Sequence, residues 1–119
     1  MIPEDLILTT PPAYGAETAR VVLDIITQFP AQHNQNVWGY VDPGCGTVCC
    51  VAGWARYVHD ENHLLDYGLA TPQLAMNALD LDAETAMRLF HRTTRPQAVR
   101  ALEYLAKGDP IDWDEVYRA

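Results

Sequence analysis

The middle of the chain reads Cys45-Gly46-Thr47-Val48-Cys49-Cys50-Val51-Ala52-Gly53-Trp54-Ala55. After Thr47, which is a suitable N-cap, there is no charged or strongly polar residue until Arg56. A helix over residues 48–57 would therefore lack a polar face along most of its length, and such a helix is typically buried on all sides. We expect it to be central, with Gly53 allowing a neighbouring helix to approach closely.

Helical patterns precede and follow this segment. Apolar residues repeat at helical spacing from Ala13 to Phe29, and Pro30 ends that pattern. Further helices are expected over residues 71–79, 82–92, 96–107 and 110–116. Their boundaries are marked by four residues with capping or stop chemistry: Asp82, Thr94, Gln97 and Gly108.

These patterns predict an all-α fold. The chain should form a single compact domain over residues 1–119, with about five helices around the central buried helix and residues 1–12 as an extended lead-in. Eight residues are expected to form the structural core: Trp38, Cys49, Val51, Gly53, Trp54, Phe90, Leu102 and Trp113.

Composition limits the classes of function. The 119 residues carry a formal net charge of −8, which argues against general binding to nucleic acid or to anionic membranes. The first residues lack the basic and apolar regions of a signal peptide, and no stretch reaches the length of a membrane-spanning helix. We therefore expect a cytoplasmic protein with no membrane partner, and three reduced cysteines.

The charge is unevenly distributed. Residues 88–107 carry five basic residues against Glu103 alone, whereas the rest of the chain is strongly acidic. This basic segment resembles a helix-turn-helix hairpin, but many helix pairs share that pattern and DNA binding is not expected. We expect the segment to contact a protein partner, through Arg88, Arg92, Arg95 and Arg100.

The cysteines and histidines raise the question of a metal site. Cys45 and Cys49 are followed by His59 and His63 at spacings that resemble zinc-ligand pairs. If one helix joins Cys49 to His59, however, its rise separates these residues by about 15 Å, too far for one zinc ion. The sequence therefore predicts no metal and no cofactor, although a cysteine-dependent enzyme or redox protein using Cys45 or Cys49 remains an alternative.

The central motif also resembles one found in small uncharacterised proteins of actinobacteria and their phages. The resemblance extends over about residues 37–113 and is carried by the central motif, Trp38 upstream, Leu79-Asp80-Leu81 with Ala86 and Leu89-Phe90, and Gly108 with Asp112-Trp113. It implies a helical accessory protein, often phage-encoded, with no assigned activity and no catalytic residues.

Together these features predict a small, acidic, non-enzymatic protein that acts by binding a host or phage protein, in the host cytoplasm if it is phage-encoded. The absence of a phosphate-binding loop, a nucleophile elbow and a His-Glu-x-x-His motif favours a binding surface over an active site. The alternatives are the cysteine-dependent protein and an acidic DNA mimic or DNA-linked regulator.

Overall fold

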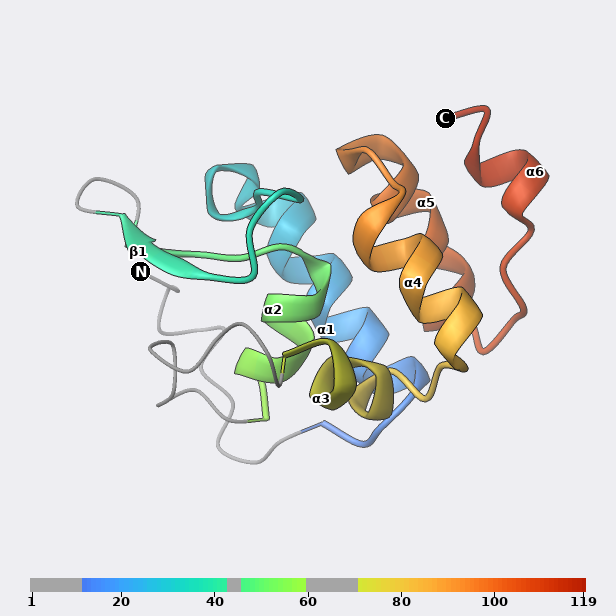
Figure 1. Cartoon of the computed structure of the whole chain (residues 1–119), viewed down its shortest axis with the longest axis horizontal. Helices are drawn as coiled ribbons and strands as arrows, with labels where there is room; N and C mark the ends of the chain where they lie inside the picture. The colour runs from blue at the N-terminus through green and yellow to red at the C-terminus, as the bar shows by residue number, and fades with distance from the viewer. Residues whose placement is uncertain (1–11, 43–45, 60–70) are drawn as a thin grey trace.

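Helices make up the body of the protein, and one short β-ribbon lies at its edge (Figure 1). The computed structural model describes residues 12–42, 46–59 and 71–119. The elements in order are α1 (Ala16–Gln28), the 3-10 helix η2 (Pro30–Gln32), β1 (Tyr40–Asp42), β2 (Gly46–Val48), α2 (Val51–Tyr57), α3 (Thr71–Ala78), α4 (Ala83–His91), α5 (Arg95–Ala106) and α6 (Trp113–Val116). The prediction of a compact all-α fold is confirmed, and none of the helices described is long and apolar enough to cross a membrane.

The longest helices, α1 and α5, pack along one another. Gly15 precedes α1 with φ +89°, a conformation that side-chain-bearing residues rarely adopt, and Pro30 follows its end. The paired faces consist of fully buried residues: Ala19, Val22, Ile25 and Ile26 of α1, and Ala98, Ala101 and Leu102 of α5.

The central helix starts later than the sequence predicts. Thr47 lies in β2, which pairs antiparallel with β1, and the N-cap of α2 is Cys50. Cys49 N–H donates to the carbonyl of Gln32, and Cys50 N–H donates to the carbonyl of Val37. These backbone bonds hold residues 46–50 in an extended conformation, so the helix cannot begin before Val51.

Helix α2 itself is buried on every side over most of its length, as expected for a helix without a polar face. Its residues Val51 to Arg56 are all buried. Trp54 is fully buried, and its indole Nε1–H donates to the carbonyl of Gln32 at 2.8 Å. This bond satisfies the one polar atom of the ring and links α2 to η2.

Gly53 is required by a close approach, although not by that of a helix. A Cβ at this position would overlap the backbone carbonyl of Trp38 and lie 2.7 Å from Cβ of Cys49. The expectation that another helix packs on Gly53 is therefore wrong, because the neighbour is the extended segment that leads into β1.

The helix boundaries after residue 71 follow local capping chemistry. The Asp82 carboxylate caps α4 by accepting from Thr85 N–H at 2.7 Å, and Gln97 Oε1 accepts from Thr94 N–H at 3.0 Å before α5. Gly108 follows α5 with φ +76°. The terminal helix α6 starts at Trp113, behind its cap Asp112, rather than at residue 110.

Candidate partner-binding surface

Arg88 lies on α4, where it contacts groups of its own chain. Its guanidinium pairs with the Glu84 carboxylate one turn earlier at 3.4 Å, and its Cζ lies 5.7 Å from the ring centre of Trp113. The side chain thus connects α4 to α6 by a cation–π contact. Arg88 is half-buried, and part of its charge is already compensated by Glu84.

Arg95 is an internal contact rather than a surface cation. Its Nη1 donates to Nδ1 of His33 at 2.8 Å, and its Nη2 donates to the carbonyl of Ile26 at 2.9 Å. The guanidinium therefore joins the start of α5 to the last turns of α1. The dipole of α1 also stabilises a positive charge near this end of the helix. Arg95 therefore contributes to the fold, and its contact with a partner stays a prediction.

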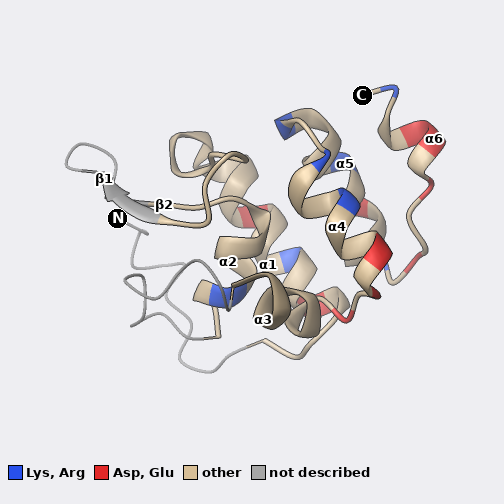
Figure 2. Cartoon of the chain, in the orientation of Figure 1, with Lys and Arg blue, Asp and Glu red and all other residues tan. Residues whose placement is uncertain are grey.

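The two remaining arginines are exposed. Arg100 on α5 pairs with Glu115 of α6 at 3.3 Å, and this carboxylate also accepts from the hydroxyl of Tyr104, an interaction that raises the pKa of Tyr104 to about 12. Arg92 directly follows α4 and forms no ion pair with another described residue. Figure 2 shows that these basic positions extend over α4 and α5, beside acidic positions on α6. The four arginines therefore do not form one uncompensated basic edge.

Arg95, His33 and Gln35 form a continuous hydrogen-bond network that reaches the end of α4. Because an arginine can only donate, Nδ1 of His33 accepts, and its Nε2–H donates to Oε1 of Gln35 at 2.7 Å. The amide of Gln35 donates to the carbonyl of Leu89 and to Oγ1 of Thr93. Burial is the main reason that the pKa of His33 is lowered; its bond to Gln35 acts in the opposite direction, and the charge of Arg95 adds a smaller decrease. The network fixes a neutral tautomer and attaches the loop after η2 to α4.

A second histidine pairs with a hydroxyl without forming a nucleophile–base pair. Thr18 is fully buried, and its Oγ1–H donates to the carbonyl of Ala13 at 2.7 Å. Its oxygen can then only accept from Nε2 of His59, 2.9 Å away. The hydroxyl proton is thus directed at a backbone carbonyl and not at the imidazole, which is the wrong arrangement for base-activated attack.

The described cysteines lack the features of reactive thiols. Cys49 and Cys50 are buried and unpaired. Burial raises the pKa of Cys49 far above its usual range and that of Cys50 to about 11, so neither forms a thiolate near neutral pH. Sγ of Cys50 accepts from Gly53 N–H at 3.4 Å, as the cap of α2. Cys45 and His63 lie outside the described residues, and no metal-binding cluster occurs among those that are described.

A concave surface of mixed polar and apolar character lies along α4, whose end is followed by Arg92. A cavity of about 540 Å³ is bounded by the loop around Trp38, by Cys50 and by Phe90 and His91 of α4. A second cavity of about 190 Å³ lies between α3 and α4, and it shares Phe90 and His91 with the first. We name the two together the α4 groove. Its other lining residues are Gln35, Asn36, Val37, Pro72, Gln73, Met76, Ala83, Ala86 and Met87.

Aromatic and thioether groups shape the α4 groove. The rings of Trp38 and His91 meet edge to face with their centres 5.4 Å apart. Met87 is 54 % exposed, one helical turn before His91. Among the eight predicted core residues, Trp38 and Trp113 are only half-buried, whereas the other six are buried. Trp38 thus belongs to a surface as well as to the core.

The α4 groove was not among the sites expected from the sequence. Ala83, Met87 and His91 repeat every four residues, so they lie on one face of α4 beside the inward face. This outward row of alanine, methionine and histidine was the signal in the sequence that could have indicated a surface. The other walls come from α3 and the Trp38 loop, whose proximity to α4 depends on the tertiary fold.

Comparisons of the chain with models of protein families, with curated proteins and with solved structures found no match.

Proposed function

We propose that this chain is a non-enzymatic accessory protein that binds another protein, and that the α4 groove is its binding surface. The observation that carries the proposal is the pair of cavities that meet at Phe90 and His91. The smaller cavity is mainly apolar, and the larger one combines Trp38 and Phe90 with the polar side chains of Gln35 and Asn36. Cavities of this kind accommodate the anchor side chains that supply most of the affinity in protein interfaces. Met87, at 54 % exposure, adds a flexible apolar side chain at the rim.

The borders of the α4 groove indicate the chemistry of the partner. Arg92 is exposed at the end of α4, directly after His91. A partner segment with one large apolar side chain and a neighbouring acidic residue would fill the cavity and pair with Arg92. Charge pairs at an interface rim mainly set the association rate and the orientation. In this proposal Arg92 alone, and not all four arginines, forms an ion pair with the partner.

The state of the polar groups supports a non-enzymatic role. The ring nitrogens of His33 and the hydroxyl proton of Thr18 are used in internal hydrogen bonds, and the thiols of Cys49 and Cys50 are protonated at neutral pH. The motif resemblance favours a phage-encoded accessory protein, so a bacterial host or a phage protein is the proposed partner.

The first experiment identifies the partner and then measures its affinity directly. Affinity purification from bacterial host lysate with mass spectrometry would supply candidates, and isothermal titration calorimetry with each purified candidate would give the dissociation constant. Met87→Glu should weaken binding at least about tenfold, because it places a carboxylate at the apolar rim. It should leave the melting temperature nearly unchanged, since exposed substitutions usually have small effects on stability.

Leu74→Glu is the matched control. Leu74 is 41 % exposed on the neighbouring helix α3 but does not line the α4 groove. It should bind like the wild type, whereas Arg92→Glu should reduce the association rate most strongly at low salt. Equal losses in Met87→Glu and Leu74→Glu, or no loss in either, would refute the α4 groove as the binding surface.

A further inference from the structure

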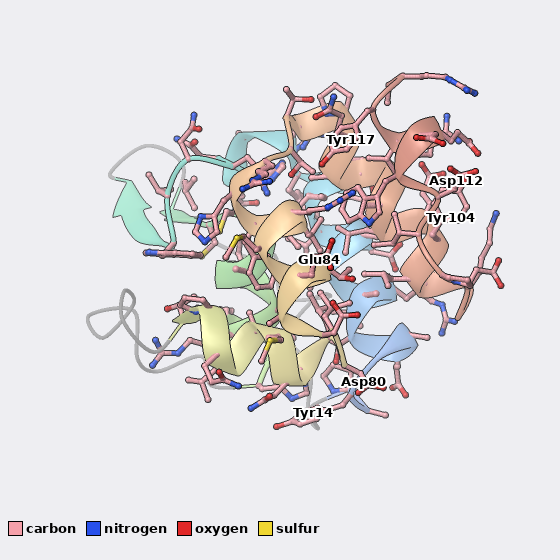
Figure 3. All side chains as sticks on the ribbon, turned by 45° about the vertical axis from the view of Figure 1, so that its right-hand side comes forward. Tyr14, Asp80, Glu84, Tyr104, Asp112 and Tyr117 are labelled. Carbon is pink, nitrogen blue, oxygen red and sulfur yellow. The ribbon has the colours of Figure 1, made fainter. Side chains whose placement is uncertain are left out.

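A second groove lies where the start of α1, the α3–α4 turn and the α5–α6 linker meet. It encloses about 390 Å³ and shares no lining residue with the α4 groove. Gly15 forms part of its wall, and a Cβ at that glycine would lie 3.7 Å from Cβ of Asp80. Figure 3 shows Asp80 close to Tyr14, at the end of the molecule where α1 begins. We name this surface the acidic groove.

The lining of the acidic groove combines an apolar floor with three carboxylates. Leu81, Ile111 and Trp113 are half-buried and contribute apolar surface. Asp80, Asp82 and Asp109 line the same groove and are exposed, and no Lys or Arg lines it. Figure 2 shows acidic positions along the α3–α4 turn, the first turn of α4 and the α5–α6 linker.

We propose that the acidic groove binds a basic segment of a protein, in which Lys or Arg residues flank an apolar residue. The apolar residue would lie on the floor formed by Leu81 and Ile111. The long aliphatic stems of the basic residues would also cover apolar surface while their charges reach the carboxylates. An acidic segment would meet three carboxylates, whereas the Arg88 guanidinium near Trp113 is already paired with Glu84, so charge complementarity selects the basic occupant.

The three carboxylates have different structural roles, which determines the design of the test. Asp82 accepts from Thr85 N–H as the cap of α4, and this bond lowers its pKa. Replacing it would disturb the helix as well as the groove. Asp80 has φ +56°, a conformation that asparagine also tolerates, and Asp109 is exposed in the linker. Asp80→Asn with Asp109→Asn therefore removes two charges with little effect on the fold.

The probe is a short fluorescein-labelled peptide of alternating Lys and Leu, compared with a matched peptide of Glu and Leu. We expect fluorescence anisotropy to detect one-to-one binding of the basic peptide only, weakening as salt concentration rises. Amide shifts in NMR spectra of the wild type should map to the α3–α4 turn and the α5–α6 linker. The Asp80→Asn, Asp109→Asn double variant should bind about tenfold more weakly.

The control is a second double variant, Asp24→Asn with Asp114→Asn. It changes the net charge equally, at exposed positions that do not line the acidic groove. Equal weakening in both double variants would show attraction by overall charge and overturn the proposal. Amide shifts located elsewhere would also overturn it, as would a Mg²⁺ titration that reproduces the same shifts at micromolar concentration.

Discussion

The His33–Arg95 network and the α4 groove meet at Gln35, which belongs to both, but they use their other residues in different ways. In the network, both ring nitrogens of His33 and two guanidinium nitrogens of Arg95 are already hydrogen-bonded within the chain. In the groove, Met87 is exposed and Trp38 is only half-buried beside a cavity. His33 and Arg95 thus stabilise the fold, whereas Met87 and Trp38 remain accessible at the groove. Each prediction below tests this division.

The largest effect is expected in the core beneath both regions. Trp54→Ala removes a fully buried ring and its hydrogen bond to the Gln32 carbonyl. Such truncations typically cost about 3–5 kcal/mol, a large share of the stability of a small domain. Urea unfolding followed by circular dichroism should show little folded protein. A variant with wild-type stability would contradict the central position of α2.

Gly53→Ala should also destabilise the protein, although alanine favours helix by about 1 kcal/mol. The added methyl group would overlap the Trp38 backbone carbonyl, so the segment that carries one wall of the α4 groove must move. We expect a net loss of about 1–3 kcal/mol in urea unfolding. A more stable variant would contradict this, because it would show that the Trp38 segment can move away from the methyl group without loss of folding free energy.

Arg95→Ala separates structural from recognition roles among the arginines. It breaks the bonds to His33 and to the Ile26 carbonyl, and hydrogen bonds to charged groups contribute about 1.5–3 kcal/mol each. Because Arg95 is only half-buried and water can replace part of each bond, we expect a combined loss of about 2 kcal/mol, less than the sum for two buried bonds. Arg100→Ala is the matched comparison on α5, because its ion pair with Glu115 is nearly half exposed and should contribute under about 1 kcal/mol. Equal losses would contradict the internal role of Arg95.

The smallest effect is a dependence of stability on pH. The pKa of His33 is lowered in the folded protein from 6.5, chiefly by burial, so the unfolded chain takes up a proton first as the pH falls. Stability should be complete above pH 6.5 and should decrease below it. Burial also lowers the pKa of His59. Unfolding midpoints measured across this range should therefore fall less steeply in His33→Gln, without becoming flat. An unchanged slope would contradict the neutral, buried state of His33.

The parts of the fold that could be predicted depend on interactions between residues that are close together in the sequence. The caps at Asp82 and Thr94 and the stop at Gly108 involve groups three or four residues apart, so their spacing in the sequence was informative. The start of α2 was predicted wrongly, because residues 46–50 form backbone hydrogen bonds with β1, with Gln32 and with Val37. These partners lie earlier in the chain and outside any helical repeat. No local pattern shows such pairing.

The candidate site was less predictable for the same reason. The contact of Arg95 with His33 joins residues 62 positions apart, so a basic residue in a basic segment was interpreted as a surface cation. The α4 groove needs walls from four separate segments: the Trp38 loop, Cys50, α3 and α4. Trp38 and Phe90 were recognised only as apolar residues, and their place beside a cavity followed from the fold.

The most direct test of the account measures stability and partner affinity together for Met87→Glu and Arg95→Ala. Met87→Glu should lower the affinity for the partner at least about tenfold at unchanged stability. Arg95→Ala should lower stability while its folded fraction binds within about twofold of the wild type. The reverse pattern, with affinity lost in folded Arg95→Ala and retained in Met87→Glu, would contradict it.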